Sequence, residues 1–131
     1  MVALESESEV LERGDQAPNF ELRGTDGDTH ELEDFDDHDA LLIVFTCNHC
    51  PYAQAKFDVM NEIESTHDDV AVVGINPNDA EQYPEDSFEK MVEHVDRGEI
   101  DITAYLRDET QDVARDHGAV CTPDPFLFEN D

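Results

Sequence analysis

Two runs of consecutive apolar residues dominate the hydrophobic pattern of the chain. Residues 41–45 read Leu-Leu-Ile-Val-Phe and residues 70–75 read Val-Ala-Val-Val-Gly-Ile, with no charge in either run. Runs of this length are typical of strands that are buried on both faces, as in the middle of a parallel sheet. The pattern therefore predicts two buried strands within one domain.

Helical spacing follows each of these runs. Apolar or small residues recur about every 3.6 positions over 53–67, which predicts a helix. A second helix is predicted to begin after Ser87, a favourable N-cap residue, and to end at Gly98. Residues 102–106 predict a short third strand, and a third helix is expected over 110–118.

The ends of the chain complete the predicted fold. Residues 1–14 are acidic and lack a period, so we expect a flexible tail there, followed by one domain over 15–131. The Asp-Gly pair at 26–27 predicts an N-terminal β-hairpin, and residues 126–128 predict a last strand. Strands that alternate with helices indicate an α/β fold, with a central parallel or mixed sheet flanked by helices.

The net charge of the chain limits the classes of partner that it can bind. It has 35 acidic and 7 basic residues, a formal net charge of −28. Such a surface repels nucleic acid and anionic membranes, so we expect neither as a partner. No signal-peptide pattern and no stretch of transmembrane length is found, which favours a cytoplasmic location. Acidic residues spread through every segment resemble the halophilic proteins of salt-loving archaea.

The candidate chemistry lies in Cys47-Asn48-His49-Cys50, directly after the first buried strand. The helix that follows must begin near Cys47, where unpaired backbone N–H groups and the helix dipole favour a thiolate. In a reducing compartment a Cys-x-x-Cys pair is more often catalytic or metal-binding than structural. Thiol-disulfide exchange needs an exposed thiolate and a second thiol nearby. We therefore predict that Cys47 attacks, that Cys50 resolves the mixed disulfide, and that His49 stabilises the thiolate.

With this motif the chain resembles the thioredoxin-like superfamily, and within it the alkyl hydroperoxide reductase/thiol-specific antioxidant (AhpC/TSA, redoxin) branch. The resemblance also rests on Ala-Pro-Asn-Phe at 17–20 and on Thr122-Pro123 before the last strand. It implies a thioredoxin-like fold and a thiol-disulfide oxidoreductase. In that superfamily the proline ahead of the late strand is cis and faces the cysteine pair, so the resemblance implies that Pro123 shapes the groove where a partner docks.

The sequence departs from that family in two places. Thr46 replaces the tryptophan that usually precedes the first cysteine. After residues 126–128 there is no room for the antiparallel strand and helix that usually close the fold, which predicts a truncated C-terminus. We expect an unpaired edge at the last strand and an uncovered sheet face, which a homodimer would cover.

Two other functions stay open at this stage. A peroxiredoxin-like thiol peroxidase would use Cys50 or Cys47 as the peroxidatic cysteine, since Cys50-Pro51 matches the Cys-Pro of that family. Neither residue three positions earlier carries a hydroxyl, however, and the last arginine is Arg115. The third reading is a zinc- or copper-binding module through Cys47, His49 and Cys50.

The dithiol reading implies no cofactor, and its expected partners are protein or low-molecular-weight thiols and disulfides. Cys121, near Pro123, is either a third redox thiol or a small buried hydrophobe. The histidines outside the motif are predicted to be solvated. They are His30, His38, His67, His94 and His117.

Low ionic strength is expected to destabilise the fold. At about 1 M salt the Debye length is roughly 3 Å, so repulsion among the acidic side chains is almost fully screened, whereas in dilute buffer it is not. The melting temperature followed by circular dichroism should therefore rise as KCl increases from millimolar to molar. A melting temperature that does not rise would contradict the halophilic interpretation.

Overall fold

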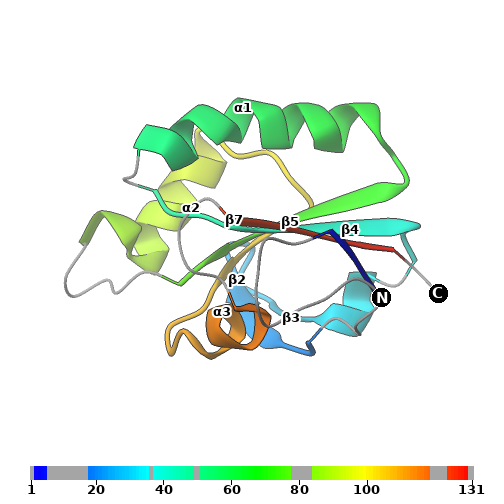
Figure 1. Ribbon diagram of the computed structural model, residues 1–131. Helices are drawn as coiled ribbons and strands as arrows, with labels where there is room; N and C mark the ends of the chain where they lie inside the picture. The colour runs from blue at the N-terminus through cyan, green and yellow to red at the C-terminus, as the bar shows by residue number, and fades with distance from the viewer. Residues whose placement is uncertain are drawn as a thin grey trace.

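The computed structural model describes residues 2–5, 18–35, 37–48, 51–77, 84–118 and 124–129. They form a mixed sheet of seven strands in the order β1-β7-β4-β5-β6-β2-β3 (Figure 1). The elements are β1 (Val2–Glu5), β2 (Glu21–Gly24), β3 (Thr29–Glu31), the 3-10 helix η1 (Leu32–Phe35), β4 (Ala40–Phe45), α1 (Pro51–Thr66), β5 (Val70–Asn76), the 3-10 helix η2 (Pro84–Asp86), α2 (Phe88–Asp96), β6 (Ala104–Arg107), α3 (Asp112–His117) and β7 (Asp124–Glu129).

The two apolar runs become the central strands of the sheet. β4 and β5 pair in parallel, with Leu41 opposite Ala71 and Ile43 opposite Val73. β4 also pairs antiparallel with β7, and β5 pairs in parallel with β6. The four side chains named in the pairing of β4 with β5 are fully buried, because strands in the middle of the sheet are covered on both faces. The prediction of two buried strands is confirmed.

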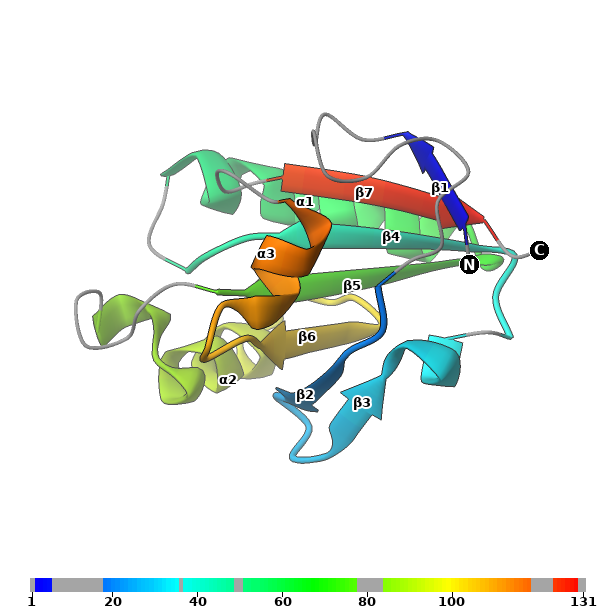
Figure 2. The ribbon, with the colours of Figure 1, turned by 60° about the horizontal axis from the view of Figure 1, so that its bottom comes forward.

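Helices cover both faces of the sheet. α1 and α2 lie on one face, where Phe57, Met60 and Met91 pack with Val72 and Tyr105. α3 and η1 lie on the other (Figure 2). The core cluster on that second face includes Phe20, Phe35, Ile43, Phe45, Leu106, Val113 and Phe126. Among the described residues Val59, on α1, is the only exposed large hydrophobic side chain, so the predicted uncovered face is not found in this part of the chain.

Local signals in the sequence set the boundaries of several elements. The hairpin of β2 and β3 turns through Gly27, whose φ of 90° favours glycine. The Ser87 side chain accepts a hydrogen bond from the backbone N–H of Lys90 at 3.3 Å, which caps α2. Gly118 ends α3 in the left-handed conformation, with φ 73°. These predictions are confirmed.

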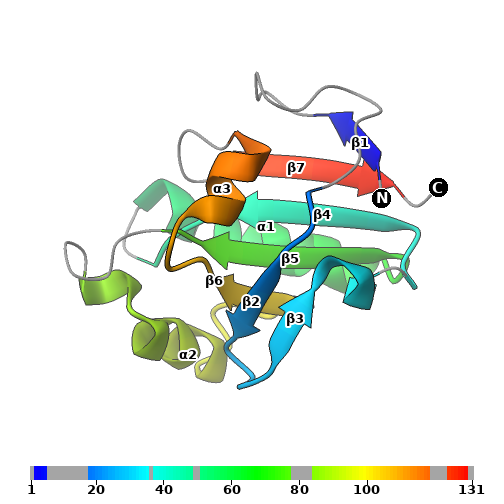
Figure 3. The same cartoon turned by 90° about the horizontal axis from the view of Figure 1, so that it is seen from below.

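The N-terminus differs from the prediction of a flexible tail (Figure 3). Val2–Glu5 forms β1, which pairs antiparallel with β7 and places Ala3 opposite Phe128. The tail prediction is wrong for this segment because the outer edge of β7 offers unpaired N–H and C=O groups that another strand can satisfy. The predicted edge at 126–128 thus has a partner strand within the chain. Residues 6–14 lie outside the described part.

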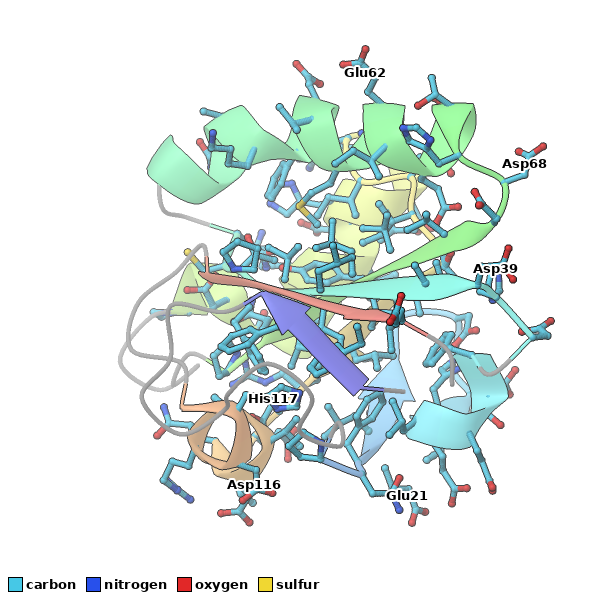
Figure 4. The ribbon with its side chains drawn as sticks, turned by 45° about the vertical axis from the view of Figure 1, so that its right-hand side comes forward. Glu21, Asp39, Glu62, Asp68, Asp116 and His117 are labelled. Carbon is cyan, nitrogen blue, oxygen red and sulfur yellow. The ribbon has the colours of Figure 1, made fainter. Side chains whose placement is uncertain are left out.

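Most of the acidic side chains that the structure describes lie at the surface, whereas Asp86 and Asp108 are buried. Glu62 on α1 and Asp68 in the loop after it point away from the sheet (Figure 4). The described helices include none that is both long and apolar enough to cross a membrane.

His117, at the end of α3, contradicts the prediction of a solvated histidine. It is fully buried, and its ring packs edge-on against Phe45, Phe126 and Phe128, with centroids 5.1, 5.4 and 5.8 Å away. Figure 4 shows it between α3 and the sheet. Its Nδ1 donates to the carbonyl of Val113 at 2.9 Å, and its Nε2 has no hydrogen-bond partner within the described residues. Burial therefore lowers the pKa of His117 from its usual 6.5. The sequence did not indicate the burial of His117, because the neighbours of this residue, Asp116 and Gly118, are polar or small.

Acid should weaken the fold through His117. An unfolded histidine has a pKa of about 6.5, so below that pH the unfolded state binds a proton that the folded state does not. The free energy of unfolding should fall as the pH drops below about 6.5, and this contribution levels off below the lowered pKa of His117. Urea unfolding in molar KCl should show less loss on acidification for His117→Leu than for the native chain. His67→Leu, at an exposed position, is the control, and equal pH dependence in all three proteins would contradict the argument.

Candidate redox site

Cys47 follows the end of β4 at Phe45, as predicted, but α1 begins at Pro51 rather than near Cys47, so the cysteine precedes the helix. Its side chain is 0% exposed, and its neighbours Thr46 and Asn48 are buried as well. The expectation of an exposed thiolate is therefore wrong for this structure. The reason is tertiary, because the segment after β4 is tied to residues from β5, β6 and η2.

Other predicted site residues cannot be placed relative to Cys47. His49, Cys50, Pro123 and Cys121 lie outside the described residues. The dithiol, the role of His49 and the groove at Pro123 therefore stay predictions. Of the three predicted metal ligands only Cys47 is described, and the described residues contain no group of three or more side chains suited to a metal ion.

Asn48, the residue after Cys47, is hydrogen-bonded through its main chain and its side chain. Its backbone N–H donates to Oδ1 of Asp86 at 2.5 Å, and its side-chain Oδ1 accepts from the Tyr105 hydroxyl at 2.8 Å. Its carbonyl accepts from Nε2 of Gln54 on α1 at 2.6 Å. These contacts turn Asn48 into the protein, which leaves its side chain 1% exposed.

Asn76, at the end of β5, connects the rest of this buried polar network. Its Nδ2 lies 3.3 Å from Oδ1 of Asp86 and 3.4 Å from the Tyr105 hydroxyl. Arg107, at the end of β6, donates through Nη1 to the Asn76 carbonyl at 3.2 Å and to its Oδ1 at 3.4 Å. The same Nη1 donates to the main-chain carbonyl of Asp86 at 3.2 Å. The ends of β5 and β6 and the helix η2 are thus tied together beside Cys47.

The tyrosine of this network cannot ionise at ordinary pH. Burial is the main cause that raises the pKa of Tyr105 far above its usual 10, and negative charge on Asp86 and on Cys47 raises it further. The hydroxyl therefore keeps the proton that it donates to Asn48. This hydrogen bond links the phenol to the residue that follows Cys47.

A glycine makes room for the tyrosine ring. Gly74 on β5 stands opposite Tyr105 on β6, and a Cβ at this position would lie 3.0 Å from Cδ1 of the ring and 3.2 Å from Cδ1 of Ile102. Such contacts are tighter than ordinary van der Waals distance, so a larger residue would push the ring away from its place. The Tyr105 hydroxyl can reach Asn48 because β5 lacks a side chain here.

Sequence reasoning missed these network residues, although one signal was present. Asn76 ends an apolar run, as Thr46 and Cys47 follow the run at 41–45. Parallel neighbouring strands place their carboxyl ends at one edge of a sheet, so polar residues at both ends should meet. Nothing in the sequence indicated Asp86, because η2 is short and reaches the site only through the tertiary fold.

Comparisons with known proteins identify the family. The model of the AhpC/TSA family matches residues 13–131. Among solved structures, a conserved protein from Geobacillus kaustophilus is 41% identical with a TM-score of 0.82, over 95% of this chain and 67% of that one. A hypothetical protein from Sinorhizobium meliloti 1021 is 33% identical with a TM-score of 0.82, over 96% of this chain and 69% of that one. Among curated proteins none matches.

More distant structures support the fold alone. The thioredoxin domain of a thiol-disulfide oxidoreductase from Bacteroides vulgatus has a TM-score of 0.72 at 12% identity, over 99% of this chain and 83% of that one. This likeness and the sheet described above confirm the predicted thioredoxin-like fold. The family match supports a redox function, and by that match this chain belongs to the AhpC/TSA family.

Proposed function

We propose that the protein is a thiol-disulfide oxidoreductase in which Cys47 attacks and Cys50 resolves. The observation that carries the proposal is the position of Cys47 between a buried central strand and the start of α1, in a chain of the AhpC/TSA family. The amide groups at such a junction favour a thiolate.

The charge at the start of α1 supports the same role. The first turn of this helix contains no acidic residue, although 35 of the 131 residues of the chain are acidic. The first acidic side chain of α1 is Asp58, which follows Lys56. No carboxylate in the first turn of α1 itself therefore neutralises the positive end of its dipole, which favours a negative sulfur in front of the helix.

The exchange proceeds in two displacements. The Cys47 thiolate attacks one sulfur of a partner disulfide, which forms a mixed disulfide and releases the other partner sulfur as a thiolate. The Cys50 thiolate then attacks Sγ of Cys47 and releases the second partner sulfur. The partner gains two electrons and becomes a dithiol after protonation from solvent, and the protein keeps a Cys47–Cys50 disulfide. An external thiol or dithiol must reduce that disulfide before the next cycle.

The burial of Cys47 places a condition on the first step. A sulfur that is 0% exposed cannot meet a partner disulfide, so attack requires a state in which Sγ is open to solvent. A disulfide of a low-molecular-weight thiol, such as glutathione disulfide, would need a smaller opening of the site than a protein disulfide. Both classes belong to the proposed substrates.

The test is disulfide exchange with insulin and with glutathione disulfide, measured in molar KCl. Cys47→Ser and Cys50→Ser should each lower the rate of complete turnover by roughly 10³-fold or more, because each removes one of the two displacements. Cys121→Ser is the matched control and should stay within about twofold of the native rate, since a thiol outside the pair takes no part in the scheme.

Two other outcomes would replace this proposal. Hydroperoxide consumption that needs Cys50 or Cys47 alone, without disulfide exchange, would favour the thiol peroxidase that the family match also allows. Stoichiometric zinc or copper in the purified protein, lost on mutation of either cysteine and accompanied by no exchange, would favour a metal-binding module.

A further inference from the structure

Two side chains from distant parts of the chain hold the residue next to Cys47. Asp86, from η2, accepts the backbone N–H of Asn48, and this N–H belongs to the peptide group that joins Cys47 to Asn48. Tyr105, from β6, donates its hydroxyl proton to the Asn48 side chain. Asp86 is 0% exposed and Tyr105 is 2% exposed. Buried bonds of this kind are strong because neither partner can turn to water instead.

Asp86 and Tyr105 are themselves fixed from behind. Nδ2 of Asn76 contacts both the Asp86 carboxylate and the Tyr105 hydroxyl, while Arg107 holds Asn76. The two side chains that bind Asn48 are therefore fixed to the ends of central strands. Tyr105 belongs to β6, and Asp86 is hydrogen-bonded to Asn76 of β5. Movement of the Cys47–Asn48 peptide group would break hydrogen bonds on both sides of Asn48.

We propose that Asp86 and Tyr105 are positioning residues for Cys47, which keep its thiol buried by holding Asn48 against the ends of β5 and β6. The proposal rests on the proposed function in one respect, that Cys47 is the reacting thiol. Asp86 and Tyr105 act through Asn48 and take no part in the displacement itself. Opening of the site for exchange then means release of Asn48 from these two side chains.

The same contact affects the ionisation of the thiol. The Asn48 N–H is one of the amides at the junction, and its bond to Asp86 commits it to a carboxylate rather than to the sulfur. A negative Asp86 also disfavours a second negative charge nearby. The described charged or titratable groups in this cluster are Cys47, Asp86, Tyr105 and Arg107, with Cys50 and His49 adjacent in sequence. Removal of the Asp86 charge alone should therefore make Cys47 easier to ionise.

The test follows alkylation of Cys47 by iodoacetamide as a function of pH in molar KCl. A Cys50→Ser/Cys121→Ser background leaves Cys47 as the only cysteine, since the chain has three. At the high-pH plateau, where the thiolate is fully formed, the rate reports access to the sulfur. Asp86→Ala should raise this plateau by at least about tenfold and Tyr105→Phe by about fivefold, the factors expected when opening no longer breaks these hydrogen bonds.

Asp86→Asn separates position from charge. Its side-chain oxygen can still accept the Asn48 N–H, so the plateau should stay within about twofold of the background protein. Loss of the negative charge should move the midpoint of the pH profile to lower pH. A merely structural role for Asp86 would not produce this split between plateau and midpoint.

Val73→Ala is the matched control. Val73 is a fully buried residue of β5 on the α3 face, and its truncation lowers the free energy of unfolding without touching Asn48. It should leave the plateau unchanged. The proposal is overturned if Tyr105→Phe and Asp86→Ala alkylate no faster than the background protein or Val73→Ala, or if Asp86→Asn alkylates as fast as Asp86→Ala.

The alkylation assay needs no exchange activity. If the native protein exchanges no disulfides but the variants show the expected plateaus, the proposed function is refuted and the positioning of Cys47 is supported. Disulfide exchange by the native protein, together with plateaus that the substitutions leave unchanged, would support the proposed function and refute the positioning of Cys47.

Discussion

Hydrogen bonds among the buried polar side chains at the carboxyl ends of β5 and β6 govern the site. Water does not reach Asn76 or Asp86, which are both fully buried, so each donor and acceptor there must find a partner within the protein. Asn76, at the end of β5, hydrogen-bonds to η2 through Asp86 and to β6 through Tyr105 and Arg107. Because these bonds come from residues far apart in sequence, they fix how the strand ends and η2 lie against each other.

The place of the cysteine follows from that arrangement. The loop after β4 leaves the sheet at the edge where the network lies, and Asn48 joins the network with its backbone N–H and its side chain. Cys47 is thereby held in the segment between β4 and α1, with its side chain buried. A position that favours ionisation and a structure that hides the sulfur are combined in one segment. In the proposed function, the reactivity of Cys47 depends on how readily that segment opens, as much as on the thiol itself.

The surface and the interior obey different electrostatic rules. The outer side chains are acidic, as Glu62 and Asp68 illustrate, and their repulsion is long-range and screened by salt. Among the described residues few ionisable side chains are buried, and burial shifts the pKa of three of them. Desolvation raises the pKa of Tyr105 and of Asp108, and lowers the pKa of His117. Asp108 uses its buried carboxylate to cap α3 through the backbone N–H groups of Val113 and Ala114. Salt therefore affects the outside of this protein much more than the site.

The sequence by itself determined the central elements of the fold and the place of Cys47 directly after the first buried strand. Residues 41–45 and 70–75 favour buried strands, because they are apolar runs of strand length, rich in β-branched residues, with no polar face to present to water. Ser87, Gly27 and Gly118 act locally through capping and backbone conformation, so their effects could be predicted without the fold. The place of Cys47 after the end of β4 follows from the same local patterns.

Only the tertiary structure decided what surrounds Cys47. Asp86 and Tyr105 reach Asn48 across 38 and 57 positions of sequence, and no periodicity contains such a separation. His117 carries a polar side chain between Asp116 and Gly118, yet the packing of α3 against Phe45 and Phe126 buries it. Val2–Glu5 lacks a clear strand pattern and forms β1 because β7 offers an open edge. Local propensity identifies an element, whereas burial and long-range hydrogen bonds depend on what the rest of the chain brings beside it.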